Sequence, residues 1–512
     1  MKRVLILCLS LLSATAFAQT AKVADSIYFF KQSRQDITYR FRNASQLVAD
    51  TFLQKTGRLD VSYSQTQGGF HLSQEPYKTQ IAELYTEGIA TLGRIKVSGQ
   101  FRFNKVWEDS LANNLSGEVN PISPYFYFAT KAGRYERQNY NGIATVAYAL
   151  LKDQLYLSGG FEYDHHWTTG SVDPRAEVQR FKLLVKPGIT YKYRKHVIGA
   201  EGIIGYGNES SSIIYKNMNF GLSLLYPDRI YYLNHAYGYI GMKDEAIYQR
   251  LRNYKGGSLS YYTTVGNWRV RALLSYEIEK ERNTRERRAK SRLDIYSRWD
   301  IDTWSGELQL QRNTARSNQQ FNVFARIRDG KDFDSVFAAN NYQYQQQQAG
   351  FSYLHQSVKR AHFQPEWGVH ANFDRSSRID VVQAHTAEYT QVNAGLTANG
   401  YWNFKNGDRF SAGITPSLRI PLESTITVPP TQENIFTRAI AYPDYYYWSS
   451  TAFRINTSFR YISSKTLKEM PVGFFVNVGY TQRLNEDAAQ YPAMTKPDKM
   501  QWTTNLGFTL YL

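Results

Sequence analysis

The residues of this chain best suited to catalysis or metal binding are histidines that lie near acidic side chains. Asp164-His165-His166 is the densest such group, and imidazole can act as a metal ligand or as an acid–base catalyst. This stretch has the alternation of a β-strand, in which adjacent side chains point to opposite faces. His165 and His166 therefore cannot readily bind the same metal ion. The other histidines are scattered along the chain as His71, His196, His235, His355, His362, His370 and His385. We therefore predict no catalytic residues and no metal site.

Other motifs that carry chemistry are equally sparse. Cys8 is the only cysteine and lies in an N-terminal apolar run, so the chain without that run has no disulfide, thiolate metal site or cysteine nucleophile. Residues 202–207 (GIIGYG) have the glycine spacing of a nucleotide loop, but they lie within a pair of predicted strands and no helix follows them. The sequence thus predicts a protein that is not an enzyme and that carries no cofactor.

Basic side chains are the strongest chemical bias of the chain, which has a formal net charge of +17. They are densest in residues 281–292 (ERNTRERRAKSR), which we expect in an outer loop. Contact with outer-membrane lipid and lipopolysaccharide is the favoured interpretation, because basic clusters commonly pair with anionic headgroups. The alternative is a funnel for anionic solutes, since charges along a pore select counter-ions. Candidate lumen-lining residues are Arg94, Lys96, Arg102, Arg269 and Arg271.

The N-terminus has the three parts of an export signal. Lys2-Arg3 supply the positive charge, residues 4–12 the apolar run, and Ala16-Phe17-Ala18 a small-x-small cleavage site. We predict cleavage after Ala18, which makes residues 1–18 a signal peptide. The apolar run is too short for a membrane-spanning helix, and no later segment approaches the roughly 20 apolar residues that such a helix needs. An exported chain of this kind is not expected to bind nucleic acid.

Long stretches of strict alternation indicate β-strands that cross a membrane. In residues 94–107, apolar or small side chains occupy one face, broken only by Lys105, and polar side chains occupy the other. This run is longer than the about five or six residues usual for a strand. Because only one face of such a strand is apolar, a mean hydropathy of −0.51 is compatible with a membrane barrel. The aromatic share of 15% suits the two aromatic girdles of such barrels.

The alternating stretches come in pairs that short turns join, which is the pattern of β-hairpins. Predicted turns lie at Lys152-Asp153, Arg194-Lys195, Gly266-Asn267, Asp302, 358–361 and 405–408. The other connections are long and polar, at 108–137, 168–179, 209–254, 281–289, 314–346, 375–387, 421–446 and 485–498. Short turns at one end and long loops at the other match the periplasmic and extracellular ends of an outer-membrane barrel.

The last stretch, residues 499–512, alternates until the chain stops, as a strand that closes a barrel should. With a first strand over 57–67, the pattern predicts about 18 strands, with 16 or 14 as alternatives. We predict an all-β protein: a single transmembrane antiparallel up-and-down β-barrel over residues 57–512. Residues 19–56 are expected to form a short periplasmic or hatch-like segment. The rival is a soluble β-sandwich or propeller, whose strands should be shorter.

Four segments form a recognisable set: 39–47 (YRFRNASQL), 173–175 (DPR), 184–191 (LVKPGITY) and 196–199 (HVIG). The set resembles an uncharacterised family of Bacteroidetes outer-membrane β-barrels, a domain of unknown function with an RNAAGL-like N-terminal segment. Ser45-Gln46 departs from the usual Ala-Gly of that segment, so the N-terminal element is expected to differ. The resemblance covers the whole mature chain. It implies the barrel and assigns no chemistry and no substrate.

The function that these observations favour is transport. We expect a passive channel or transporter in the bacterial outer membrane, inserted there by the barrel-assembly machinery, that admits small anionic or hydrophobic molecules. A non-conducting barrel that binds a partner or has a structural role in an envelope complex is the second hypothesis. A hydrolase with its residues on the barrel wall is the third. The barrel alone does not decide among them, because a fold does not fix a function.

Overall fold

The computed structural model describes residues 43–49, 55–118, 121–222, 225–241, 246–287, 293–358, 362–467, 470–485 and 489–512. The predicted signal peptide, residues 1–18, lies outside the described residues. Within the described part, no helix is long and apolar enough to cross a membrane.

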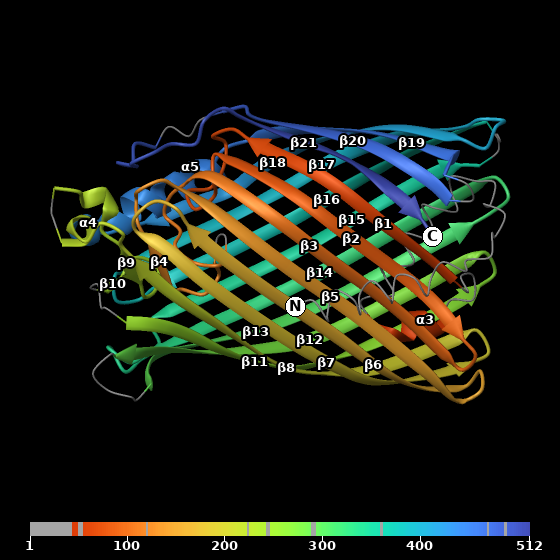
Figure 1. Cartoon of the computed structure of the whole chain (residues 1–512), viewed down its shortest axis with the longest axis horizontal. Coiled ribbons are helices and arrows are strands. Elements are labelled where there is room, and N and C mark those ends of the chain that lie inside the picture. Colours follow the sequence, from red (N-terminus) through yellow and green to blue (C-terminus); the bar gives the residue numbers. More distant parts are fainter. Residues whose placement is uncertain are drawn as a thin grey trace.

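Eighteen strands form one closed antiparallel barrel, in which each strand pairs with its neighbours along the chain (Figure 1). The first strand closes the barrel against the last, with Arg58 opposite Tyr511 and Gln67 opposite Trp502. This confirms the predicted all-β fold and the predicted strand number. The strands are β1 (Lys55–Gln67), β2 (Lys78–Leu92), β3 (Ile95–Leu111), β5 (Gly133–Leu151), β6 (Leu155–Gly170), β7 (Arg175–Tyr193), β8 (His196–Ile214), β11 (Ala246–Val265), β12 (Trp268–Arg287), β13 (Leu293–Asn313), β14 (Ser317–Asp334), β15 (Tyr342–Ser357), β16 (Phe363–Asp380), β17 (His385–Asn403), β18 (Arg409–Thr427), β19 (Ala452–Leu467), β20 (Met470–Arg483) and β21 (Met500–Tyr511).

The alternation along each strand separates an apolar outer surface from a polar lumen. On β8, Ile198 and Ile204 are exposed on the outside, whereas Glu201 between them is buried inside. A closed barrel satisfies every backbone hydrogen bond of its strands, and it is one of the few structures that can do so in hydrocarbon. An apolar outer face on a closed barrel of this size is therefore that of an outer-membrane-type protein.

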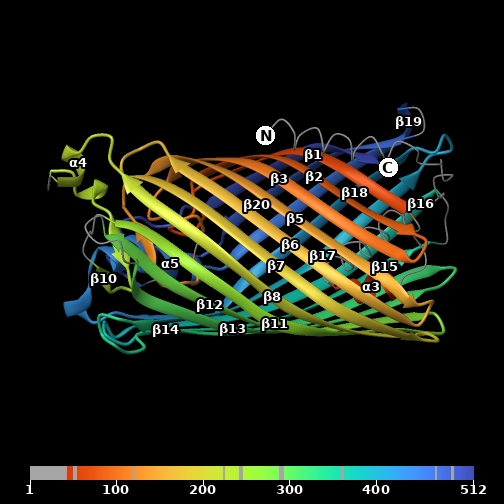
Figure 2. The same ribbon diagram turned by 60° about the horizontal axis from the view of Figure 1, so that its bottom comes forward.

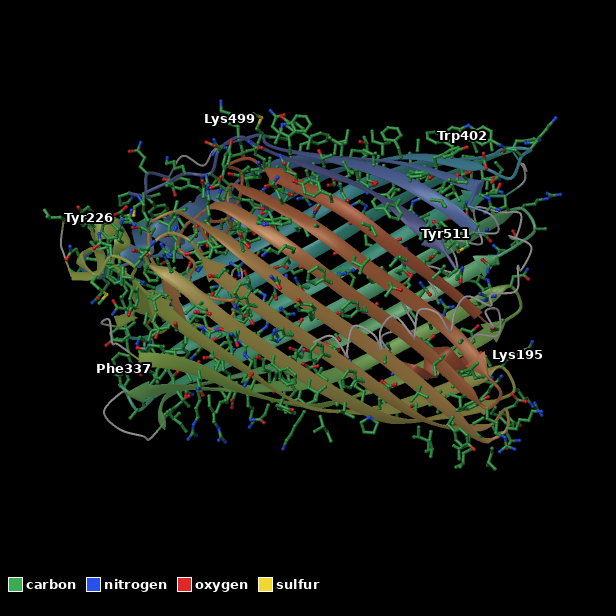
Figure 3. The ribbon with its side chains drawn as sticks, viewed as in Figure 1. Lys195, Tyr226, Phe337, Trp402, Lys499 and Tyr511 are labelled. Carbon is green, nitrogen blue, oxygen red and sulfur yellow. The ribbon has the colours of Figure 1, made fainter. Side chains whose placement is uncertain are left out.

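The two ends of the barrel differ as the sequence predicts. Short turns join β5 to β6, β7 to β8 and β11 to β12, and Asp153, Arg194 and Gly266 take positive φ angles of 60°, 53° and 58° there. The long connections lie at the opposite end, where α4 (Asn219–Leu222) and β10 (Ile240–Gly241) are seen in Figure 2. In Figure 3, Lys195 marks the end with the turns, and Tyr226 marks the end with the loops. We call them the periplasmic and the outer end.

The predicted turn at Asp302 is wrong, and so is the predicted loop over 314–346. Residue 302 lies in the middle of β13, where it pairs with Ile278 and with Asp329. Its carboxylate is on the outer surface and accepts a hydrogen bond from the Tyr276 hydroxyl at 3.1 Å, so this lone polar residue does not mark a turn. The strand β14 occupies most of the predicted loop. The two errors cancel, which is why the predicted number of strands still holds.

Several strands also extend further toward the outer end than predicted. β12 extends through residue 287, so the first part of the basic run 281–292 is strand rather than loop. Residues 288–292 lie outside the described part. The connections predicted at 168–179 and 375–387 shorten to 171–174 and 381–384 for the same reason.

Three long connections fold together at the outer end, and we call their described residues within 112–132, 215–245 and 428–451 the cap. They contribute β4 (Phe126–Phe128), β9 (Tyr232–Asn234) and β10, which form a separate sheet of three strands, and the 3-10 turns η1 (Pro227–Arg229) and η2 (Pro430–Gln432), the π-helical turn η3 (Thr437–Ala441) and the helix α5 (Tyr442–Trp448). Phe436 lies 5.4 Å from Tyr237 and 6.0 Å from Phe128, measured between ring centroids. The cap thus has a buried aromatic core, packed against inward-facing side chains of the barrel.

A short helix, α3 (Ala44–Ala49), lies inside the barrel near its periplasmic end (Figure 1). It contacts β5, β7, β8 and β11, and Val48 packs against Ala147, Tyr156 and Val197 of the wall. This helix belongs to the segment 19–56 that the sequence places before the barrel. All six residues of α3 are buried, so this part of the segment packs against the wall of the lumen.

Candidate functional site

The lumen contains a cavity of about 1360 Å³ between the cap and the barrel wall, which we call the chamber. Side chains of β1, β2, β3, β5, β6, β7, β11, β12, β13, β14, β19 and β21 line it, together with residues of the 68–77 connection and residues 117, 118, 122, 123 and 447 of the cap. Its charged side chains are eight acids and eight bases, so no sign of charge dominates. They are Glu75, Glu108, Glu118, Glu162, Asp164, Glu277, Glu279, Glu281, Arg102, Arg137, Arg180, Lys182, Arg252, Arg326, Arg328 and Arg454.

Glu118 of the cap is the centre of an ion-pair network in the chamber. Its Oε1 accepts hydrogen bonds from Arg180 Nη1 at 2.8 Å and from Arg252 Nη1 at 2.9 Å. Burial raises the pKa of this carboxyl, but the charges of Arg252 and Arg180 outweigh burial and hold the pKa well below its ordinary value. Glu118 therefore stays ionised at neutral pH and fastens the cap to two strands of the wall.

A second attachment joins the cap to the same region of the wall. Ser123 donates a hydrogen bond to Glu281 Oε1 at 2.8 Å, and the other oxygen of Glu281 accepts one from Arg252 Nε at 2.8 Å. The Glu281 side chain is completely buried, so it depends on these partners to offset the loss of water. Arg252 thus bridges the cap and β12, and its removal would leave the buried Glu281 without its nearest positive charge.

A third attachment involves Arg137 of β5. Its Nε lies 2.7 Å from Glu108 Oε2, and its Nη1 donates to the carbonyl of Gly117 at 2.8 Å. Both charged side chains are 4% exposed. A buried pair of this kind requires well-aligned partners, since the desolvation of two charges is costly. The first cap connection is therefore fixed by ion pairs and hydrogen bonds to four strands of the wall, β5, β7, β11 and β12.

The histidines of the Asp164-His165-His166 group separate, as expected for a strand. His166 points into the lumen, where Asn139 and Thr168 engage its two ring nitrogens. His165 packs against Tyr140 on the outer surface, with 5.9 Å between ring centroids. Among the described residues, no group of three or more His, Cys, Asp or Glu side chains is arranged to hold a metal ion.

The five predicted lumen-lining residues fall into different places. Arg94 lies in the turn between β2 and β3 and is exposed at the periplasmic end, so its assignment to the lumen wall is corrected. Arg102 lines the chamber, with its Nε 3.5 Å from Glu83 Oε2. Lys96, Arg269 and Arg271 lie on inward faces nearer the periplasmic end and do not line the chamber: Lys96 Nζ donates to the carbonyl of Leu47 at 3.1 Å, and Arg271 Nη1 to Gln309 Oε1 at 2.6 Å.

The residues that organise the chamber, Glu118, Arg137, Arg180 and Arg252, were not singled out from the sequence. Their common feature is a charge on the inward face of a long strand or on a connection between strands. Arginines at alternate positions, such as Arg250 and Arg252, point to the lumen, and this spacing is visible in the sequence. Their partners are not, because ion pairs between distant strands depend on where the cap folds back.

The helix α3 is held at the periplasmic end by polar contacts. The amide of Ala44 donates to Glu201 Oε1 at 2.6 Å, and Asn43 Nδ2 donates to Ser258 Oγ at 3.1 Å. Ser45 forms a hydrogen bond with Ser260. A Cβ atom on Gly199 would lie 2.5 Å from the Ser45 Cβ, so only glycine leaves room for the segment at that point.

A family model described as "Family of unknown function (DUF6850)" matches residues 44–512. Among solved structures, the FrpB iron transporter from Neisseria meningitidis is 8% identical, with 92% of this chain covering 83% of that chain and a TM-score of 0.42. The copper transporter OprC is 9% identical (90% and 81% covered, TM-score 0.39), and OccAB3 of Acinetobacter baumannii is 11% identical (90% and 99% covered, TM-score 0.32). No curated protein has a matching sequence.

Proposed function

Because the chain belongs to this family of unknown function, we propose its role from its own structure: it transports small polar solutes across the outer membrane, by way of the chamber. In this proposal residues 1–18 are removed after Ala18, the barrel-assembly machinery inserts the chain, and the cap controls entry from outside. The observation that carries the proposal is the chamber itself, a charged cavity inside a closed barrel.

The charge pattern of the chamber favours solutes that carry both signs of charge or many hydroxyl groups. Arg102 and Lys182 lie on the same lining surface as Glu277 and Glu279, so a passing solute meets donors and acceptors together. A strong preference for anions would need an excess of basic groups at the narrow part of a pore. The sequence predicts an anionic or hydrophobic solute, whereas the chamber favours a polar solute with balanced charges.

The cap favours a gated passage over a permanently open pore. Its aromatic core is buried, and the attachments through Glu118, Ser123 and Arg137 connect it to the wall. Ion pairs of this kind have two arrangements, paired or separated, and a bistable contact is what a gate requires. In this proposal, solute enters when the first cap connection leaves the wall.

Single-channel recording of the refolded mature chain in planar bilayers tests the proposal. We expect brief openings for the wild type and longer openings for Glu118→Gln, because the variant weakens the attachment of the cap. The matched control is Glu136→Gln, since Glu136 pairs with Lys105 at an exposed site of β5 away from the chamber. Similar conductance to K⁺ and Cl⁻ would agree with the balanced charges. A folded barrel that never conducts, with or without the substitution, would overturn the proposal.

The second candidate is a non-conducting barrel that binds a partner or supports an envelope complex. The cap core and the docked helix α3 favour it, because each fills part of the lumen. Absence of conductance in every cap variant, with a stable barrel, is the result that would select it. The hydrolase alternative has less support, since both ring nitrogens of His166 are engaged by Asn139 and Thr168.

A further inference from the structure

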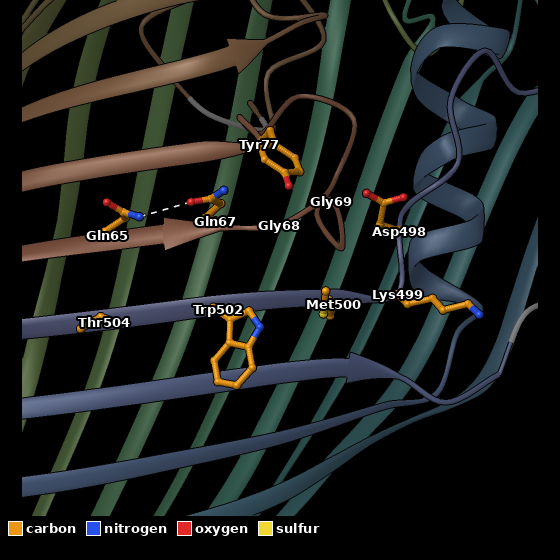
Figure 4. Close-up of a pocket in the computed structure, with 10 residues that line it drawn as sticks. All are labelled: Gln65, Gln67, Gly68, Gly69, Tyr77, Asp498, Lys499, Met500, Trp502 and Thr504. Carbon is orange, nitrogen blue, oxygen red and sulfur yellow. Dashed lines mark hydrogen bonds between the residues drawn. The ribbon is translucent and has the colours of Figure 1, made fainter.

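A second cavity lies on the outside of the barrel, at the outer end of the seam between β1 and β21 (Figure 4). Its volume is about 660 Å³, and residues of β1, β21 and the connections next to them line it. Trp502 and Met500 are each 50% exposed and Tyr77 is 42% exposed. We call it the seam pocket. It faces away from the lumen, so the proposed transport function does not account for it.

The seam pocket lies at the height where the outer surface changes from apolar to polar. Outward-facing residues of β1 change from Leu59, Val61 and Tyr63 to Gln65 and Gln67. This change marks the upper edge of the hydrocarbon layer, where tyrosine and tryptophan side chains collect in membrane proteins. A molecule in this pocket would have its polar part beside the glutamines.

The neighbouring strands carry residues typical of the membrane interface at the same height. On β21 the apolar Phe508 and Leu506 are followed by Thr504 and then by the exposed Trp502 and Met500, which line the pocket with Thr504. On β20, Tyr480 packs against Trp502 with 4.3 Å between ring centroids, and its hydroxyl donates to Gln482 Oε1 at 3.2 Å. The apolar wall directly below the pocket is therefore available to acyl chains, and the pocket itself to a headgroup.

One acidic and one basic side chain line the pocket. Asp498 and Lys499 are both exposed, and neither forms an ion pair within the described part of the chain. Figure 4 shows the two side chains pointing in different directions from adjacent residues. Two separated opposite charges complement a ligand that carries a phosphate and an ammonium group at its two ends.

The backbone beneath these charges is held in place on both sides. Asp498 N donates to the carbonyl of Gly69 at 2.9 Å, and Arg483 N donates to the carbonyl of Lys499 at 2.8 Å. A Cβ atom on Gly69 would lie 2.1 Å from Asp498 Oδ2, so a larger residue there would displace the carboxylate. Preorganised groups lose less freedom on binding, which favours a specific site over incidental contact.

We propose that the seam pocket binds the headgroup of an outer-membrane lipid that carries both a phosphate and a primary ammonium group. Lys499 contacts the phosphate, Asp498 contacts the ammonium, and Gln65 and Gln67 offer hydrogen bonds to the ester and hydroxyl oxygens. The acyl chains lie along the outer faces of β1 and β21. Such a lipid would stabilise the seam where the first and the last strand meet, because it contacts both.

Lipid binding to the detergent-solubilised, full-length mature chain tests the proposal. Native mass spectrometry is used to titrate phosphatidylethanolamine, with phosphatidylglycerol as the headgroup that lacks the ammonium. We expect one tightly retained phosphatidylethanolamine and about fivefold weaker retention in Lys499→Glu, since one basic contact near a phosphate contributes about that factor. Lys195→Glu, at an exposed periplasmic turn, is the matched control and should bind as the wild type does.

Three results would overturn the assignment. One is equal retention of both lipids by the wild type, which would mean that the ammonium is not recognised. Another is unchanged retention in Lys499→Glu when gel mobility before and after heating shows a folded barrel. The third is equal binding of free phosphoethanolamine at the same concentration, which would indicate a site for a soluble phosphate ester rather than a lipid. Loss of retention in Asp498→Asn, with retention of phosphatidylglycerol unchanged, would support the proposed orientation.

Discussion

Glu118 and Arg252 are 134 residues apart in the chain, yet Arg252 Nη1 donates a hydrogen bond to Glu118 Oε1 at 2.9 Å inside the lumen. Glu118 belongs to a connection at the outer end, and Arg252 to the inward face of β11. The contact forms because the first cap connection, within residues 112–132, folds back into the barrel. A single carboxylate thus joins the cap to two strands that line the chamber.

Glu118→Gln should loosen the first cap connection without unfolding the barrel. The substitution removes the ion pairs with Arg180 and Arg252 but keeps the shape of the side chain. We expect the cap to lose roughly 1–3 kcal/mol, less than a fully buried pair, because Glu118 is partly exposed to the chamber. Limited proteolysis within 112–132 measures this, with Glu136→Gln as the control. Equal cleavage of both variants and the wild type would mean that the ion pairs do not hold the connection.

The Asp444 carboxyl should make the cap more stable in mild acid. Burial raises its pKa to about 6, although hydrogen bonds from Ser73 oppose the shift. Because the pKa in the folded state is above the ordinary value of 3.8, the favourable contribution is complete below that value and is lost as pH rises through 6. Hydrogen exchange of α5, corrected for the intrinsic rate, should be slower at pH 5 than at pH 7.5.

Asp444→Asn serves as the control for that measurement. Asparagine cannot ionise but can still accept the hydrogen bond that Ser73 N donates at 2.8 Å. Exchange of α5 in this variant should therefore be slow at both pH values. We expect the attachment through Glu118 to persist between pH 5 and pH 7.5. The pKa of Glu118 is lowered, so the stability that its carboxylate contributes is lost only when pH falls below the ordinary value of 4.5. A wild-type cap with equal exchange at pH 5 and 7.5 would contradict the role of Asp444.

Phe436→Ala should open the cap by emptying its core. Phe436 is 1% exposed and lies among Phe126, Phe128 and Tyr237. Truncation of a buried phenylalanine costs about 3–5 kcal/mol, which we expect to fall on the cap rather than on the strands. The measurements are open time in single-channel recording and gel mobility of the unheated barrel. Phe404→Ala, at an exposed periplasmic turn, should change neither, and a Phe436 variant that matches it would show that the core does not govern closure.

Gly199→Val should displace the helix α3 from the wall. The new side chain would occupy the space of Ser45 and break its contact with Ser260. Because Cys8, the only cysteine, lies in the predicted signal peptide, Ala49→Cys in a chain that starts at Gln19 provides a single thiol, buried when α3 is docked. We expect maleimide labelling of that thiol to accelerate about tenfold or more in Gly199→Val, since opening populations change tenfold for each 1.4 kcal/mol.

The control for this prediction is Gly142→Val on β5. A Cβ atom there meets only Tyr163 Cβ, at 4.0 Å, and the position is on the outer surface. Labelling of residue 49 should then stay at the rate of the parent protein. If both glycine variants accelerate labelling equally, the effect comes from general loosening of the barrel rather than from the docking of α3.

The sequence predicts the strands correctly wherever one face is apolar and the other polar. The 94–107 stretch and the last stretch of the chain were identified in this way, and the structure has β3 and β21 there. The prediction was wrong where one residue disturbed the pattern. The sequence predicts a turn at Asp302, which lies on the outer face of β13, and it predicts a loop over β14, because glutamine, asparagine and arginine occupy much of that strand.

The predicted lumen residues show how far the alternation extends toward function. It indicates which face of a strand is inward, and the side chains of Lys96, Arg102 and Arg271 lie on inward faces. It does not indicate the depth of a residue along the barrel, and Arg94, predicted on the wall, lies in a turn. The alternation also carries no information about the cap, because the cap connections have no periodic pattern of apolar and polar residues.

The sequence by itself determined the barrel and the two sides of its wall, because an alternation of period two is a property of neighbouring residues. Only the tertiary structure decided that the outer connections return to the lumen as a cap, that Glu118 meets Arg180 and Arg252, and that α3 lies against the wall. Those contacts join residues far apart in the chain. They depend on the closure of the barrel, which no local pattern of residues describes.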